Sequence, residues 1–443
     1  MKPEILPPPP AVTWRTHLSL LLLALVYVFS YIDRNVVAIL IEPIKREFGA
    51  SDTEMGLLTG LAFGMLYAVA CIPLGRLADR GANRRNIVAV CCGLWSLATV
   101  ACGMAAQFWQ LMSARMAVAI GEAGGMAPAI SMIADLYPRE RRSLVISLFM
   151  MGPHIGLLLA MVAGGWIAQH HGWRTTFLFF GIPGALLAAL VWLVVGEPRR
   201  GGFDGPAPVA APAGGDGLPA QLRALLAIQP FRLLCLGCGL AGIAGYGYGI
   251  WAPTFLVRSH GMPLATAGLL FGFTSGLGAA AGAIFCGWYC DRLTRRDPRW
   301  QLRLPLIGIV ISLPLGCAFL LWPAGAYWTV GTLAIPHAML FAAGFGFFNS
   351  WWPPLAYAAS SHLMPARQRT LGAAVLNLFL TLFGAGFGPL VSGALSDFFT
   401  ASLGPGSLRY ALVATLTLLV LTVLLFARAI QPYAHRLKAM GAA

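Results

Sequence analysis

The stretch "VYVFSYIDRNVVAIL", Val26 to Leu40, is apolar enough to lie in lipid, yet it places an acid and a base, Asp33 and Arg34, near its middle. Of the 443 residues, 58% are hydrophobic and 10% are charged, whereas a soluble domain has about 25% charged residues. This composition predicts a membrane protein. Lipid offers no partner for open backbone groups, and the apolar runs are too long for barrel strands, so we expect an all-α membrane protein.

The chain divides into twelve predominantly apolar runs of about 20 residues, which is the length that a spanning helix needs. No small-residue cleavage site follows the first run, so we expect that run to remain in the mature protein as a helix. The predicted spans are 17–42, 54–75, 86–105, 108–134, 143–168, 174–195, 232–256, 265–289, 304–322, 329–360, 371–396 and 409–428.

Basic residues are unevenly distributed over the predicted loops. If both termini are cytoplasmic, most of the 30 Lys and Arg residues fall on the inside, as the positive-inside rule requires. The net charge of +14 is therefore interpreted as a sign of topology, and no nucleic-acid partner is expected. We predict a multi-pass protein of a bacterial-type inner membrane with both termini in the cytoplasm. The basic residues assigned to the outside are Lys45, Arg46, Arg174, Arg258 and Arg409.

The nine cysteines lie in or at the ends of the apolar runs, and no histidine spacing typical of a metal site accompanies them. Cys235 and Cys238 have a C-x-x-C spacing, which on a membrane helix is interpreted as packing. We expect no disulfide, metal or cofactor. A membrane-embedded enzyme would need a cluster of His, Asp or Ser at a membrane face, and the sequence has no clear one.

A segment rich in Gly, Pro and Ala, "GEPRRGGFDGPAPVAAPAGGDGLPAQ" (residues 196–221), separates the sixth predicted span from the seventh. Such a composition is typical of a flexible linker. It predicts two six-helix bundles, at residues 17–195 and 232–428, joined by a cytoplasmic linker at 196–231. Cytoplasmic tails are expected at 1–16 and 429–443.

An internal repeat spans this linker. "GRLADRGANRR" (Gly75 to Arg85) follows the second predicted span, and "GWYCDRLTRRDPRW" (Gly287 to Trp300) follows the eighth. "YPRERRS" (Tyr137 to Ser143) and "MPARQRT" (Met364 to Thr370) form a second matching pair. Duplicated six-helix units are typical of secondary transporters that move their halves around a central site.

The loop after the second span resembles the G-x-x-x-D-R-x-G-x-R-R signature of the major facilitator superfamily, although Ala82 and Asn83 add one residue of spacing. The second copy is degenerate, since Leu293 replaces a glycine. The resemblance implies two pseudo-symmetric bundles and a cytoplasmic latch between them, while an ordinary positively charged loop is the alternative. The predicted latch residues are Gly75, Asp79, Arg80, Arg84, Asp135, Gly287, Asp291 and Arg292, with Asp135 equally well explained as a solvated end charge.

Within that superfamily the chain most resembles the Spinster-type branch, and next a branch of organic anion symporters. The motifs that carry the resemblance are "YIDRN", the run from Ala114 to Arg142, "GWRTTF" and "FGPLVSGALSD". The helix-five signature of drug antiporters is present only as "GPHIG", Gly152 to Gly156. The first branch implies an amphipathic lipid-like substrate, and the second implies an organic acid.

Four charges fall inside predicted spans: Asp33 and Arg34 in the first, and Arg115 and Glu122 in the fourth. A charge at a helix centre costs about 2.5–3.5 kcal/mol on insertion scales, so each needs an explanation. Arg115 and Glu122 are two turns apart and share a helix face. We expect Asp33 or Glu122 to carry a proton, with Arg34 or Arg115 as a gate or anion-binding group. A static buried ion pair is the alternative.

Aromatic and polar residues in other spans are candidates for lining a substrate cavity, although packing is an equally good explanation for each. Together these features predict a proton-coupled secondary active transporter, with symport the expected mode, that moves a small amphipathic or anionic organic solute by alternating access. We expect it to be a monomer with membrane lipids around it. The alternatives are a drug or metabolite exporter of the same fold, a membrane-embedded enzyme and a passive channel. The cavity candidates are Tyr31, His154, Tyr246, Tyr248, Trp251, Asn349, Trp351 and Asn377.

Overall fold

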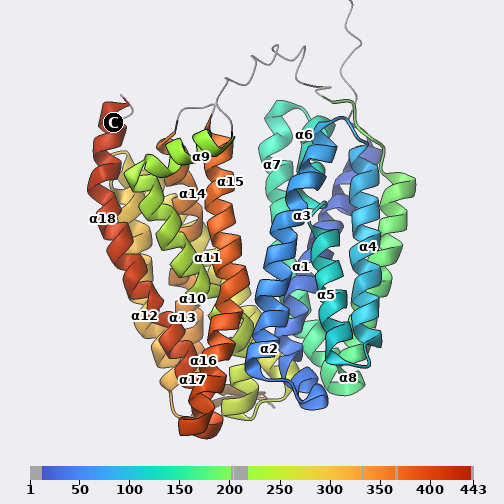
Figure 1. The fold of residues 1–443 in the computed structure, drawn as a ribbon, viewed down its shortest axis with the longest axis vertical. Helices are drawn as coiled ribbons and strands as arrows, with labels where there is room; N and C mark the ends of the chain where they lie inside the picture. Colours follow the sequence, from blue (N-terminus) through green and yellow to red (C-terminus); the bar gives the residue numbers. More distant parts are fainter. Residues whose placement is uncertain (1–11, 201–202, 204–217, 332, 365–367, 441–443) are drawn as a thin grey trace, which may run out of the picture. The chain divides into compact units, whose positions relative to one another are not determined.

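The computed structural model describes residues 12–200, 203, 218–331, 333–364 and 368–440, without the side chains of Asp79, Arg139, Ser143, Leu218 and Thr370. Residues 201–202 and 204–217 of the predicted linker, both chain ends and the middle of "MPARQRT" lie outside the described residues. The described chain is helical apart from one antiparallel hairpin, β1 (Tyr327–Val330) and β2 (Leu333–Pro336), in which Tyr327 pairs with Pro336. Figure 1 shows the helices coloured along the sequence.

Nine helical stretches within the described residues are long and apolar enough to cross a membrane. Two of them, Glu140–Val194 and Leu371–Ala439, each contain two predicted spans. The first is interrupted at Gly172, whose φ of 83° is outside the helical region. The predicted span 329–360 differs from the structure, because its first residues belong to β1 and β2 and the rest is divided into α13 (Ala338–Asn349) and α14 (Trp352–His362).

Large apolar side chains remain exposed along these helices, among them Ile72, Val90, Leu193, Ile284 and Phe398. Contiguous apolar surface of this kind is rare on soluble monomers. In a bilayer the same surface contacts lipid without cost, so the exposure agrees with the composition.

Contact clustering divides the chain into two units. Unit 1 comprises Met1–Asp33, Val69–Gly156 and Phe177–Gly215, and unit 2 comprises Arg34–Ala68, Leu157–Thr176 and Asp216–Ala443. Unit 2 therefore contains two segments from the first half of the sequence, residues 34–68 and 157–176, with the second half. The boundary between the units falls between Asp33 and Arg34.

Unit 1 is built around α4, which packs against α5 and α6, while α6 packs against α7. α5 approaches α4 closely because residue 121 is a glycine: a Cβ there would lie 2.8 Å from the backbone nitrogen of Trp95. Helices whose residues lie wholly or partly in unit 1 are α1 (Trp14–Phe48), α3 (Ala62–Asp79), α4 (Arg84–Met104), α5 (Phe108–Glu122), α6 (Met126–Leu136), α7 (Arg139–Met150) and α8 (Gly152–Val194).

Unit 2 is organised around α10, which packs against α16, α17 and α18, while α13 packs against α11 and α12. α9 lies within the predicted linker 196–231, and α10 begins before the predicted residue 232. The further elements are α2 (Asp52–Gly56), η1 (Leu57–Leu61), α9 (Leu218–Ala227), α10 (Gln229–His260), α11 (Leu264–Thr294), α12 (Trp300–Leu321), α15 (Arg369–Phe379), η3 (Leu380–Phe387), α16 (Gly388–Leu403), η4 (Gly404–Gly406), α17 (Ser407–Leu416) and α18 (Leu418–Ala439).

The short connection from α1 to α2 follows directly from its sequence, "FGASDTE". Gly49 adopts a φ of 66°, which ends α1. Ser51 then caps α2, because its Oγ accepts from the Glu54 amide at 3.0 Å while the Glu54 carboxylate accepts from the Ser51 amide at 2.8 Å. This reciprocal capping box positions Asp52 at the first turn of α2.

Candidate functional site

Three ionisable side chains are buried together in unit 1: Asp33 on α1, and Arg115 and Glu122 on α5. Their exposed fractions are 1%, 1% and 2%. Arg115 Nη1 donates to the backbone carbonyl oxygen of Asp33 at 2.9 Å. The carboxyl group of Asp33 interacts electrostatically with both Arg115 and Glu122. Ser30, also on α1, donates its hydroxyl to Glu122 Oε2 at 3.0 Å. The structure thus brings these three charges to one place, which we call the Asp33 cluster.

Glu122 is the last residue of α5, and the helix is interrupted immediately after it. Residues 123–125 form a turn, and α6 begins at Met126. The predicted single span 108–134 is therefore two helices. The turn is tightly packed, since a Cβ on Gly124 would lie 2.4 Å from Cys91 Sγ. Discontinuous membrane helices are common at ion and substrate sites, because the interruption frees backbone groups there.

Arg34 has a different environment, in unit 2. Its guanidinium carbon lies 4.4 Å from the centre of the Tyr67 ring and 5.4 Å from that of Phe63. Such a cation–π arrangement holds a guanidinium where its charge is stabilised by ring faces. Neighbouring residues on a helix diverge by about 100°, and Asp33 and Arg34 accordingly have separate sets of contacts.

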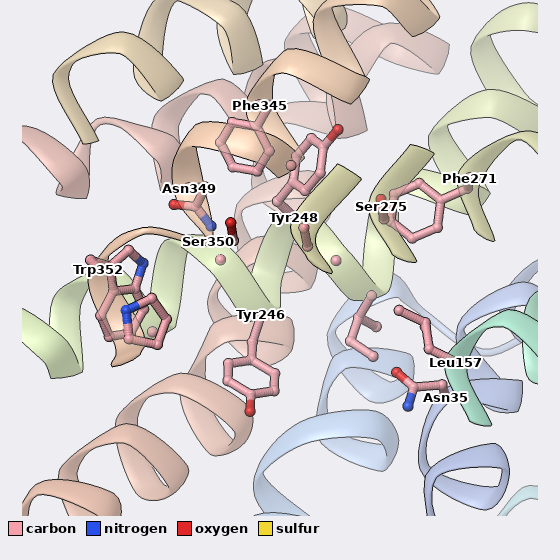
Figure 2. A pocket seen from close by; sticks show the side chains of 17 residues that line it. Asn35, Leu157, Tyr246, Tyr248, Phe271, Ser275, Phe345, Asn349, Ser350 and Trp352 are labelled. Atoms are coloured by element: carbon pink, nitrogen blue, oxygen red, sulfur yellow. The ribbon is translucent and has the colours of Figure 1, made fainter. Parts of the chain in front are cut away.

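A cavity of about 340 Å³ lies inside unit 2 (Figure 2). Its walls come from α10, α11, α13 and α14, with Asn35 of α1 and Leu157 of α8. Five rings line it, and none of the lining side chains carries a charge. Glycines of α10 supply part of the wall, which leaves room beside the rings. The lining rings are Tyr246, Tyr248, Phe271, Phe345 and Trp352.

Residues 23–383 match the family model described as Major Facilitator Superfamily. The chain belongs to the Major Facilitator Superfamily. The predicted helical membrane fold of this superfamily is thereby confirmed. Because its members are transporters, this superfamily protein is a transporter of small molecules and not an enzyme.

Individual relatives agree with this assignment. An "MFS-type efflux pump" of Mycolicibacterium smegmatis is 35% identical over 88% of this chain and 87% of its own length. The D-galactonate transporter of Escherichia coli is 26% identical over 86% and 90%. The crystal structure of a bacterial homologue of the human lysosomal transporter Spinster, inward-facing and unoccupied, is similar with a TM-score of 0.83 and 30% identity, covering 95% and 98% of the two chains. The predicted likeness to the Spinster branch is confirmed.

Three of the predicted cavity residues of this superfamily transporter, Tyr246, Tyr248 and Asn349, line the cavity of unit 2. The other three predicted residues of unit 2, Trp251, Trp351 and Asn377, are not among the lining residues, and each has other contacts. Trp251 is fully buried and donates its Nε1 to the Pro389 carbonyl oxygen at 2.9 Å. Trp351 packs in an apolar cluster around Cys286 and Leu304.

Asn377 is exposed and accepts a hydrogen bond from the Tyr357 hydroxyl at 3.0 Å. The last two predicted cavity residues belong to unit 1. Tyr31 is half-buried, with its ring edge-on to Tyr27 at 5.2 Å between centroids, and His154 is exposed. Neither is among the residues that line the cavity of unit 2, and their predicted roles stay predictions.

Among the predicted latch residues, Arg84 forms the densest set of contacts. It is 2% exposed and bonds Asp135 at 2.5 Å and Glu197 at 2.7 Å, both in unit 1. Among the described residues, a Cβ on Gly75 or Gly287 would meet nothing within 4 Å, and the latch between the bundles stays a prediction. Arg80 and Asp291 are exposed, Arg292 lies 3.8 Å over the Trp288 ring, and the Asp79 side chain is outside the described residues.

Sequence reasoning missed a second group of charges, in unit 2, that we call the Asp52 cluster (Glu42, Lys45, Asp52, Arg258 and Asp397). Asp52 is 2% exposed; it accepts from Lys45 at 2.5 Å, from both terminal nitrogens of Arg258 and from the Ser396 hydroxyl at 2.7 Å. Asp397 on α16 accepts from the backbone amides of Asp52 and Thr53 at 3.0 and 2.7 Å. The only indication of this cluster in the sequence was that all five charged residues stand near the ends of predicted spans that face the outside.

The described residues hold no group of three His, Cys, Asp or Glu side chains that could bind a metal ion. The side chains of the two clusters are carboxylates, guanidinium groups and one ammonium group, which can bind protons and form ion pairs. Both clusters combine segments that are far apart in the sequence.

Proposed function

We propose that this transporter moves a small organic acid with an aromatic or amphipathic body, in symport with protons. The observation that carries the proposal is the burial of Asp33, Arg115 and Glu122 side by side in unit 1. With all three ionised, two carboxylates and one guanidinium leave one negative charge in a buried place, which is costly. A single proton neutralises the group.

The Asp33 cluster is thus suited to hold one exchangeable proton that its two carboxyl groups share. Arg115 donates to the carbonyl of Asp33, which ties α5 to α1 in either protonation state. Movement of α1 relative to α5 would then change the charge that each carboxyl group experiences and release or bind the proton.

The nature of the substrate is supported by two observations on unit 2. Arg34 provides a cation, held by the Tyr67 and Phe63 rings, and the next residue, Asn35, lines the cavity. The cavity itself offers rings and neutral polar groups. An organic acid would place its carboxylate towards Arg34 and its apolar body among the rings. The D-galactonate transporter among the relatives acts on an organic acid, in line with an anionic substrate.

Alternating access requires contacts that form in one state and break in another. We propose that the Asp52 cluster is such a gate, at the end of the bundle that the positive-inside rule assigns to the outside. It joins α1 and α2 from the first half of the sequence to α10 and α16 from the second. We further propose an inner membrane of bacterial type, cytoplasmic termini and a monomer that contacts lipid directly.

Uptake by purified protein in liposomes tests the coupling. We expect Asp33→Asn and Glu122→Gln to abolish accumulation driven by a proton gradient while retaining substrate counterflow, which needs no net proton movement. Arg223→Gln, an exposed substitution on α9, is the control with unchanged uptake. Undiminished gradient-driven accumulation by both acid variants would refute proton coupling through this cluster.

A second candidate is export, supported by the efflux pump from M. smegmatis at 35% identity. Export and import use the same fold and differ in which gradient drives the substrate. Accumulation of the substrate in cells with and without a protonophore separates them: collapse of the proton gradient raises the internal level for an exporter and lowers it for an importer.

A further inference from the structure

The C-terminal end of α11 and the turn after it carry three exposed arginines, Arg292, Arg295 and Arg296, which we call the arginine triad. Within the described residues the triad forms no ion pair. Of the two acids in the same connection, Asp297 bonds Arg303 at 3.1 Å and Asp291 is exposed. The connection therefore presents an excess of positive charge that the proposed mechanism does not use.

The two copies of the repeated loop motif use their arginines differently. In the first copy, Arg84 is 2% exposed and bonds Asp135 and Glu197. Arg296 follows Arg84 at the same separation in the sequence as Gly287 follows Gly75, yet it is exposed. The arginine of the first copy thus stabilises its own unit, whereas that of the second copy is available to a partner outside the chain.

The triad continues an apolar stripe along α11. Ile284 and Trp288 are 75% and 51% exposed. Arg292 and Arg295 follow Trp288 at four- and seven-residue spacings, so they share its helix face. Ile284 comes about two and a half turns after the cavity residue Ser275, which places it about 180° around the helix. The stripe therefore faces away from the cavity of unit 2, as a surface in contact with lipid does.

Aromatic rings mark the point where the stripe changes from apolar to basic. The guanidinium carbon of Arg292 lies 3.8 Å from the centre of the Trp288 ring. The Phe285 and Tyr289 rings are 6.2 and 6.4 Å from it, and both are exposed. Exposed Trp and Tyr side chains are typical of the headgroup depth of a bilayer. The Trp288 ring face thus holds the Arg292 charge at that depth.

The chemistry of this surface narrows what it binds. A guanidinium group binds phosphate oxygens through parallel N–H bonds. Arg292 and Arg295 are one helical turn apart, close enough to share one phosphate group. A zwitterionic lipid brings a cation of its own, whereas an anionic lipid complements the net positive charge that remains after Asp291 is counted. The acyl chains of such a lipid would lie along Ile284 and the apolar stripe.

We infer that the arginine triad and the Trp288 ring bind the phosphate group of an anionic phospholipid. The inference rests on the proposed topology for the leaflet alone. The positive-inside rule assigns this end of α11 to the cytoplasmic side, where anionic lipids give the membrane a negative surface.

Intact-protein mass spectrometry of the delipidated full-length protein in detergent tests this, with dioleoyl phosphatidylglycerol and dioleoyl phosphatidylcholine as probes. The two lipids have the same acyl chains and differ in headgroup charge, so the ratio of their dissociation constants isolates recognition of the charge. We expect the unmodified protein to prefer phosphatidylglycerol by about tenfold or more. In the double variant Arg292→Gln, Arg295→Gln the ratio should fall towards one, and in Trp288→Leu it should fall part of the way.

The double variant Arg223→Gln, Arg428→Gln is the matched control, because it removes two exposed arginines of unit 2 from other helices. It should keep the full ratio. An equal fall in this control would mean diffuse attraction without a site. That result, equal binding of the two lipids by the unmodified protein, an unchanged ratio in the Arg292 and Arg295 variant, or displacement of the lipid by an equal concentration of inorganic phosphate would each overturn the inference.

The binding measurement needs neither a substrate nor a proton gradient. The proposed function is judged separately by the dependence of uptake on Asp33 and Glu122, so the two can fail independently.

Discussion

Arg258 donates both terminal nitrogens of its guanidinium to the carboxylate of Asp52, each at 2.8 Å, and donates its Nε to Glu42 at 2.6 Å. Asp52 begins α2 and Arg258 stands in the last turn of α10, so the pair joins the two halves of the sequence inside unit 2. Two parallel bonds between guanidinium and carboxylate hold a defined geometry as well as a charge pair. Any state in which α2 and α10 separate must break them.

Replacing Asp52 by Asn should lower the thermal stability of the purified protein clearly. Removing one partner of a buried ion pair costs about 3–5 kcal/mol, because the other charge stays buried without its partner. Differential scanning fluorimetry measures the change. Arg46→Gln is the control, since its pair with Glu42 is 73% exposed on the arginine side and such surface pairs contribute about 0–1 kcal/mol. Equal melting temperatures of Asp52→Asn and the unmodified protein would contradict the expected role of Asp52.

Asp397 should contribute separately, through the amides at the start of α2. Its carboxylate accepts from the Asp52 and Thr53 amides and from the Thr53 hydroxyl at 2.6 Å. Loss of a helix-capping acceptor costs about 0.5–2 kcal/mol. We expect Asp397→Ala to be destabilised by this amount and Asp397→Asn by less, because asparagine keeps an acceptor oxygen. If the two variants melt together, the carboxylate does not act as a cap.

Gly121→Ala should lower the stability of the protein, whereas Gly75→Ala should leave it unchanged or raise it slightly. A Cβ at residue 121 would lie 2.8 Å from Trp95 atoms, and one at residue 75 would meet nothing within 4 Å. Overpacking typically costs about 1–3 kcal/mol, while alanine in an open helical position gains about 0.5–1 kcal/mol over glycine. Melting temperatures of the two variants test this contrast. A stable Gly121→Ala protein would show that α5 can move away from α4.

Arg84→Gln should destabilise unit 1 more than Arg85→Gln. Arg84 is buried and binds Asp135, Glu197 and the Ser131 hydroxyl, so its loss leaves two acids without their cation. We expect a loss of about 3–5 kcal/mol. Arg85, whose side chain donates to the neighbouring Asn86, should change stability little. Similar unfolding curves of the two variants would mean that Arg84 is dispensable.

The local features of this protein follow from its sequence. Hydropathy located the spanning helices, since a lipid-facing helix needs only a run of apolar residues. "FGASDTE" contains its own helix stop and capping box. The spacing of Arg115 and Glu122 placed both on one helix face, and the structure has them buried together. Hydropathy missed the turn after Glu122 and the hairpin inside 329–360, because a short interruption hardly changes an average over 20 residues.

The sequence alone thus determined that the chain is a helical membrane transporter with charges buried where lipid would reject them. Only the tertiary structure decided which distant groups meet. Arg115 is paired with the Asp33 carbonyl, Arg34 with the Tyr67 ring, and Arg258 with Asp52, although each arginine had several candidate partners. Hydropathy and spacing are properties of neighbouring residues, whereas the choice of a partner for each arginine depends on how segments tens to hundreds of residues apart pack against each other.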